Sequence, residues 1–280
     1  MPMAESRAFA LLEPISCTDN IAELCSALAE KKICSVYGPD DTQRAHFLAA
    51  LAAKSGRQML ILTPNDGLAM RMTEDLNVML DGCARFLPAR DVSFVKSSAS
   101  SHDLAMRRIE VIGACLTGQV QVLVCAADAA MHRMDKPERF EKHMVFLSEE
   151  DRMEPMALIE KLTQAGYERV QLVEARGQCA LRGGILDVYP IGEPNALRIE
   201  FFDDEIDSIR SFDVMTQRSI SRRSSARIYP AKELLLTDKK PATLQTGCAM
   251  SWNAAKAVRN MISVKRSWKR NLVWIRLKSS

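Results

Sequence analysis

Residues 38–43 lie between a short apolar run and an amphipathic stretch, the position that a nucleotide-binding loop would occupy. Such a loop, G-x-x-x-x-G-K-[ST], needs glycines that expose backbone N–H groups to phosphate, a lysine for the terminal phosphates and a hydroxyl for Mg²⁺. Here the turn reads Gly38-Pro39-Asp40-Asp41-Thr42-Gln43. Pro39 lacks an N–H donor, two carboxylates would repel phosphate, and Thr42 can serve as a helix N-cap. We therefore expect a degenerate phosphate loop that does not bind ATP.

The remaining groups that could do chemistry do not form a recognisable site. The eight cysteines are scattered without C-x-x-C spacing and are expected to be reduced and mostly buried, and the four histidines are isolated from one another. The acidic run Asp203-Asp204-Glu205-Asp207 is interpreted as a solvated hairpin tip, because it contains no histidine. Asp187 stands between apolar neighbours and is interpreted as a structural carboxylate. We expect no catalytic residue, no metal and no cofactor.

The first half of the chain alternates apolar strands with amphipathic helices. Strands are expected at 33–37, 59–62, 85–88 and 121–125, with helices at 42–54, 68–80 and 104–116. Continuous apolar strands that alternate with helices indicate βαβ units and a parallel sheet. The pattern predicts an α/β domain shaped like an NTPase.

The pattern changes after about residue 143. We expect a strand at 144–147, a helix at 156–166 and then closely spaced strands at 170–174, 179–181, 185–189, 197–202 and 206–212. Turn residues between these strands predict an antiparallel α+β domain. The expected domains are therefore 1–143 and 144–230, followed by an irregular tail at 231–280.

Three stretches carry a family resemblance. L-R-G-G-I-L-D-V-Y-P at 181–190, together with L-R-I-E-F-F-D-D-E-I-D-S-I-R-S-F-D at 197–213 and T-Q-R-S-I at 216–220, resembles the UvrB-like N-terminal module of bacterial transcription-repair coupling factors. The resemblance implies a degenerate, non-ATPase domain 1a at 1–143, a UvrA-interaction domain at 144–230, and the start of domain 1b before a divergent basic tail at 231–280. It also implies a non-enzymatic adaptor that recruits UvrA, the damage-recognition ATPase of nucleotide excision repair, by mimicking UvrB. RNA polymerase and DNA would be bound only through domains that this chain lacks.

The expected strand at 197–202 has one apolar face and one mixed face. Arg198 and Phe202 share the mixed face, and an aromatic side chain beside arginine is typical of a protein-binding hot spot. The alternatives are that Phe202 packs against a helix or begins the turn, and that Arg182 is an ordinary surface arginine. The resemblance assigns the UvrA contacts to Arg182, Arg198 and Phe202.

The charge of the chain is unevenly distributed. Its formal net charge is only +3, but residues 239–280 hold ten lysines or arginines, no acidic residue and all three tryptophans, whereas residues 1–238 carry −7. One interpretation is an arm that binds nucleic acid or a membrane surface. A nucleic-acid-binding protein is the alternative function, and no membrane partner is expected. The other interpretation is a frame-shifted gene end. A third function, an ATPase that uses the first domain, is disfavoured by the turn at 38–43.

The sequence predicts no membrane association. The N-terminus lacks the basic start and apolar core of a signal peptide, and the long uncharged run at 111–127 is too short and too polar to span a bilayer. We therefore expect a cytoplasmic protein.

Overall fold

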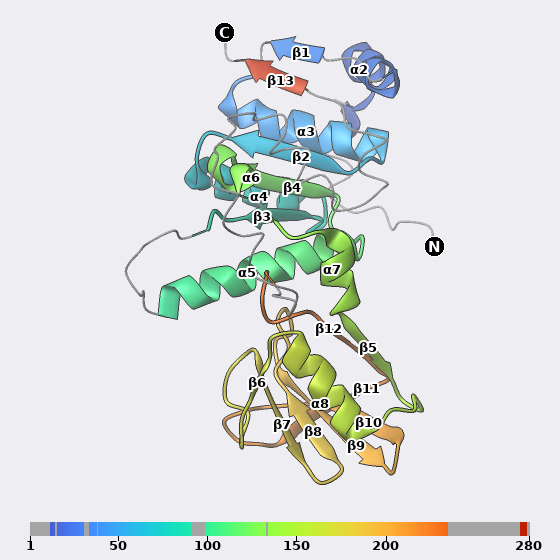
Figure 1. Cartoon of the computed structure of the whole chain (residues 1–280). Helices are drawn as coiled ribbons and strands as arrows, with labels where there is room; N and C mark the ends of the chain where they lie inside the picture. The colour runs from blue at the N-terminus through green and yellow to red at the C-terminus, as the bar shows by residue number, and fades with distance from the viewer. Residues whose placement is uncertain are drawn as a thin grey trace. The chain divides into compact units, whose positions relative to one another are not determined.

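The computed structural model describes residues 12–14, 16–30, 34–37, 39–90, 99–132, 134–234 and 275–278. The chain divides into two compact units, which are considered separately (Figure 1). Unit 1 comprises residues 1–90, 114–133 and 253–280, and unit 2 comprises residues 91–113 and 134–252. Helix α5 (Ala99–Leu116) therefore contributes residues to both units.

Unit 1 contains the expected parallel sheet. Its strands β2 (Met59–Thr63), β4 (Val122–Ala126) and β3 (Ala84–Leu87) lie in the order β2-β4-β3. Every residue of the central strand β4 is buried, which explains its uninterrupted apolar sequence. Helices α3 (Asp41–Ser55) and α4 (Asp66–Met79) supply leucines and alanines to the core beside this sheet. The short helix α6 (Ala127–Met131) follows β4.

A second pair of strands in unit 1 joins distant parts of the chain. Strand β1 (Cys34–Tyr37) pairs in parallel with β13 (Ile275–Lys278), beside helix α2 (Asp19–Ala29) (Figure 1). The expectation of an irregular tail at 231–280 is wrong for β13, because backbone pairing with β1 makes these four residues a strand. Residues 235–274, 279 and 280 lie outside the described residues.

Helix α3 begins one residue earlier than its apolar pattern indicated, and Asp40 is its N-cap in place of the expected Thr42. The Asp40 carboxylate accepts a hydrogen bond from the Gln43 N–H at 2.9 Å, as an N-cap residue does with the third helical residue. Thr42 is already the second helical residue, which is why it cannot fill this role. Gly38 lies outside the described residues, so the degenerate phosphate loop stays a prediction.

Unit 2 is built on a six-stranded sheet with the order β11-β10-β9-β8-β7-β6. Its strands are β6 (Glu168–Arg169), β7 (Gln178–Arg182), β8 (Ile185–Val188), β9 (Ala196–Phe202), β10 (Glu205–Phe212) and β11 (Ser219–Arg223). All neighbours are antiparallel except β6 and β7, which agrees with the expected antiparallel domain. A separate antiparallel ribbon pairs β5 (Val145–Ser148) with β12 (Ser225–Ile228). Besides the residues of α5, this unit contains the helices α7 (Pro137–Lys142) and α8 (Pro155–Gln164).

The two faces of the six-stranded sheet are covered unequally. On one face, apolar residues of β8, β9 and β10 form the main core with α8 and with the β5–β12 ribbon. On the other face, a smaller cluster of Val173, Ala180, Ala196 and Phe212 covers the sheet next to the loop at 170–175. The remainder of this second face carries polar side chains together with the exposed apolar residues Ile185 and Phe202, and it is called the open face below.

The expected strand at 170–174 is wrong. Strand β6 ends at Arg169, and the following residues form a loop because the Gln178 Oε1 atom accepts hydrogen bonds from the N–H groups of Glu174 and Ala175, both at 3.0 Å. Val173 nevertheless is buried, which accounts for the strand-like apolar pattern. Strands β11 and β12 were not expected, because their serines and arginines carry little strand signal.

A close contact in unit 2 joins α5 to the residues after β12. An added Cβ at Gly113 would lie 2.8 Å from three ring atoms of Tyr229. The carbonyl of Tyr229 accepts a hydrogen bond from the Tyr167 hydroxyl at 2.7 Å, so the backbone that carries the ring is held in place. The absence of a side chain at Gly113 is therefore a packing requirement.

Gly113→Ala is predicted to lower the free energy of unfolding by about 1–3 kcal/mol, the usual cost of overpacking. Gly67→Ala in α4 is the matched control, because its added Cβ would meet only the Asn65 Oδ1 atom at an ordinary 3.5 Å. Helix propensity alone favours alanine by up to ~1 kcal/mol, so this variant is expected to be neutral or more stable. Urea denaturation measures both, and equal stabilisation by the two substitutions would contradict the packing argument.

Stability is also predicted to fall in alkaline solution. Burial raises the pKa of Cys179 to about 11, from 9.0 in the unfolded chain, and that of Cys115 to about 12. The unfolded chain therefore releases these protons at lower pH than the folded chain, so the stability present below pH 9 is lost as the pH rises toward 11. The slope is at most ~1.4 kcal/mol per pH unit for each thiol. Urea unfolding between pH 8 and 11 should show a smaller loss for Cys179→Ala than for the unchanged chain; equal losses would argue against this role of Cys179.

Candidate protein-docking site

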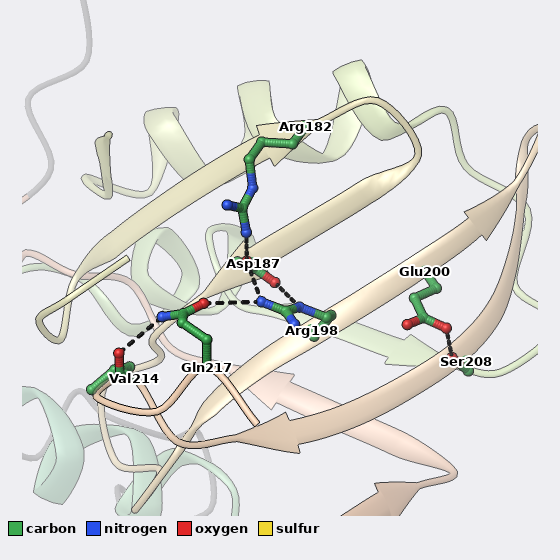
Figure 2. A network of polar contacts seen from close by, with 7 residues as sticks. All are labelled: Arg182, Asp187, Arg198, Glu200, Ser208, Val214 and Gln217. Carbon is green, nitrogen blue, oxygen red and sulfur yellow. Dashed lines mark hydrogen bonds and ion pairs between the residues drawn. The ribbon is translucent and has the colours of Figure 1, made fainter. Parts of the chain in front are cut away.

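Three adjacent strands place charged side chains on the open face of unit 2. Asp187 of β8 pairs directly with Arg198 of β9, and Ala180 of β7 pairs with Asp187 on its other side. Arg182 lies two residues after Ala180 and therefore shares its face. The structure thus brings together two of the residues expected from the sequence, Arg182 and Arg198, with Asp187 between them (Figure 2).

The Asp187 carboxylate is the centre of this cluster and is only 1% exposed. Arg198 donates to it through two nitrogens, with Nε–Oδ1 at 2.7 Å and Nη2–Oδ2 at 2.9 Å. Arg182 donates from Nη2 to the same Oδ2 atom at 2.6 Å. A buried carboxylate is costly unless it is paired and hydrogen-bonded, and here two guanidinium groups meet that requirement.

Arg198 is held on several sides. Its Nη2 also donates to the Gln217 Oε1 atom at 3.2 Å, while the Gln217 side-chain amide donates to the Val214 carbonyl at 2.9 Å (Figure 2). The guanidinium lies over the Phe212 ring, 4.5 Å from its centroid, and the side chain is 17% exposed. The hydrogen bonds with Asp187 raise the pKa of Arg198 above its ordinary value. Arg198 is thus fixed in one orientation with little of its surface free to meet a partner.

The position of Gln217 depends on a local turn. The Asp213 carboxylate accepts hydrogen bonds from the N–H and the hydroxyl of Thr216, and the Asp213 carbonyl accepts one from the Gln217 N–H at 2.7 Å. Gln217 adopts a left-handed backbone conformation, with φ at +58°. This turn directs an otherwise distant side chain onto Arg198.

Arg182 and Phe202 are more accessible than Arg198. The Arg182 side chain is 49% exposed and comes directly before the Gly183-Gly184 turn, which needs the left-handed conformation of Gly183 at φ +61°. Phe202 is 80% exposed at the end of β9, on the same face as Arg198 and Glu200. The alternative that Phe202 packs against a helix is therefore wrong, whereas it does directly precede the turn at 203–204.

A second polar group lies beside the cluster on the same face. Glu200 accepts a hydrogen bond from the buried Ser208 hydroxyl at 2.8 Å (Figure 2). It also forms an ion pair with Arg210 at 3.4 Å. Sequence reasoning missed this group and Gln217. The sequence does contain a signal for the arginine cluster. Asp187 stands between the apolar residues Leu186 and Val188, and a carboxylate buried among apolar residues needs a cationic partner.

The site offers binding groups and no evident reactive centre. No group of three or more histidine, cysteine or acidic residues that could hold a metal ion occurs within the described ranges. Among the helices of these same ranges, none is long and apolar enough to cross a membrane. An exposed phenylalanine beside ordered arginines is instead the composition of a protein-binding hot spot.

Comparison with known proteins matches residues 145–234 to the UvrB interaction domain. The chain is 34% identical over 226 residues to the transcription-repair-coupling factor of Bacillus subtilis (strain 168), which covers 79% of this chain and 19% of the relative. It is 31% identical over 206 residues to that of Staphylococcus aureus (strain bovine RF122 / ET3-1), with 73% and 18% covered, and 30% identical over 233 residues to that of Staphylococcus epidermidis (strain ATCC 35984), with 82% and 20% covered.

The chain spans about a fifth of the length of these curated relatives. The matched domain contains the whole six-stranded sheet and all the residues of the docking site. The similarity beyond it extends over most of the chain and is shared with relatives that carry one name. Over most of its length the chain is therefore similar to transcription-repair-coupling factors, and its residues 145–234 match the UvrB interaction domain.

Proposed function

We propose that residues 144–230 recruit UvrA, and that the open face of unit 2 is the surface that UvrA contacts. The observation that carries this proposal is the 80% exposure of Phe202 at the edge of an ordered arginine cluster. A large apolar side chain held in solvent on a fixed strand gains free energy only when a partner covers it. Burial of such a side chain is worth about 1.5–3 kcal/mol.

The three proposed contact residues have different roles. Phe202 inserts into an apolar recess of UvrA, and Arg182 directs its remaining N–H groups to acidic or carbonyl oxygens of that partner. Arg198 contributes mainly by supporting this surface, since its guanidinium already binds Asp187 and Gln217. This division follows from their exposure, which decreases from Phe202 to Arg182 to Arg198.

The resulting activity is that of an adaptor in transcription-coupled nucleotide excision repair. By presenting a UvrB-like surface, the chain would bind UvrA in place of UvrB, and no catalytic step is required of it. Residues 1–143 act as a degenerate, non-ATPase domain 1a, and residues from 231 begin domain 1b. RNA polymerase and DNA are engaged by parts of the relatives that lie outside the segment matched here.

Phe202→Ala is predicted to weaken UvrA binding by at least about 1 kcal/mol, or roughly fivefold in Kd, because it removes the proposed anchor. Arg198→Glu is predicted to weaken it at least as much, since it places a carboxylate against Asp187 and disrupts the supporting cluster. Titration of purified UvrA with each variant measures these changes.

Phe146→Ala is the matched control. Phe146 is also an exposed phenylalanine of unit 2, 59% accessible, but it lies on the β5–β12 ribbon beneath the Arg227 guanidinium and not on the six-stranded sheet. Its removal is expected to leave UvrA affinity unchanged. Equal affinity for the unchanged chain and Phe202→Ala, or equal losses for both phenylalanines, would disprove the assigned surface.

A further inference from the structure

We infer that Asp187 is a positioning residue of the docking surface, which holds Arg182 and Arg198 in the arrangement that a partner meets, with Gln217 as a second support for Arg198. This inference rests on the proposed function and deepens it. Asp187 itself is buried and cannot reach a partner. It would act entirely through the two arginines that it binds.

The two arginines are coupled through one oxygen atom. Oδ2 of Asp187 accepts a hydrogen bond from Nη2 of Arg198 at 2.9 Å and another from Nη2 of Arg182 at 2.6 Å. A free arginine side chain samples many rotamers, and ordering it during binding would reduce affinity. Asp187 fixes both guanidiniums in the unbound protein. The conformational entropy of the two arginine side chains is therefore lost during folding and not during association.

The charge balance of the cluster predicts the chemistry that Arg182 meets. One carboxylate is shared by two guanidiniums, so the cluster has a net charge of +1. Arg182 is the more exposed of the two arginines. The neighbouring Glu200 is paired with Arg210 and hydrogen-bonded to Ser208. We therefore expect the partner to place an acidic side chain or a carbonyl oxygen opposite Arg182, next to its recess for Phe202.

The neighbours of Asp187 allow its positioning role to be separated from a general effect on folding. Leu186 and Val188 point into the main core on the opposite face of the sheet, together with α8. The described hydrogen bonds of the Asp187 carboxylate go to Arg182 and Arg198. Asp187→Asn keeps the side-chain shape and removes the charge, so it should release the arginines while the core stays packed.

The experiment is a double-mutant cycle for UvrA binding by the full chain. Arg182→Ala and Asp187→Asn are each expected to raise the Kd about tenfold. The double variant should be clearly less than about a hundredfold weaker, because both substitutions remove the Arg182–Asp187 interaction and Asp187→Asn adds only the effect on Arg198. Asp187→Asn combined with Phe202→Ala should instead give the product of the two single effects, since no described contact joins these residues. A multiplicative result for the Arg182 pair would overturn the positioning role.

Glu233→Gln is the matched control for loss of stability. Glu233 forms a buried ion pair with Arg108 at 2.9 Å within unit 2, and neither residue lies on the open face. The substitution removes a buried carboxylate charge as Asp187→Asn does, and it is expected to leave UvrA affinity within twofold of the unchanged chain. Equal losses of affinity for Glu233→Gln and Asp187→Asn would mean that Asp187→Asn weakens binding only by destabilising the fold, and would overturn the inference.

A second measurement does not require UvrA. In nuclear magnetic resonance spectra of the unbound chain, the Nε–H of Arg198 should exchange slowly with solvent, exchange much faster in Asp187→Asn, and be unaffected in Glu233→Gln. Rapid exchange in the unchanged chain would overturn the inference directly. If exchange behaves as expected but Arg182→Ala and Phe202→Ala bind UvrA normally, the proposed function fails and the failure lies in the assigned surface, not in the hold of Asp187 on Arg198.

Discussion

The unequal covering of the two faces of the six-stranded sheet determines where unit 2 carries apolar residues and where it carries paired polar residues. Side chains alternate between the two faces of each strand, and α8 with the β5–β12 ribbon buries only one of them. The small cluster around Phe212 covers part of the other face. The strands must therefore carry polar residues where cover ends, and these residues must be paired because the sheet itself partly buries them. The Asp187 cluster and the Glu200 group meet this requirement.

The same pairing produces a surface suited to recognition. Arginines that were free would be mobile, and a carboxylate that was unpaired would destabilise the fold. Shared between two guanidiniums, the carboxylate gives an ordered surface that retains positive charge at its edge. The turn at 213–218 adds Gln217 as a further fixed contact. Stability and partner recognition thus depend on the same hydrogen bonds.

Sequence patterns predicted much of the fold, because local periodicity reports which face of an element is buried. The parallel sheet, most strands of the antiparallel sheet and the exposed face of β9 follow from spacing alone. The loop at 170–175 resembled a strand because Val173 is buried although its backbone is irregular. Arg182, Arg198 and Phe202 were assigned as contact residues from a family resemblance. Gln217 could not be found from periodicity, because a local turn places its side chain against Arg198, which lies 19 residues earlier in the sequence.

The compact unit that carries the docking site extends beyond the matched domain. Residues 91–113 belong to unit 2, and α5 provides Arg108 for the buried ion pair with Glu233. Gly113 of the same helix accommodates the Tyr229 ring, and the Tyr229 carbonyl in turn binds the Tyr167 hydroxyl beneath the main core. A piece beginning at residue 145 would leave a buried carboxylate without its cation and an aromatic ring without its cover. The stability of unit 2 therefore depends on α5, which lies outside the matched domain, as well as on the residues of the six-stranded sheet.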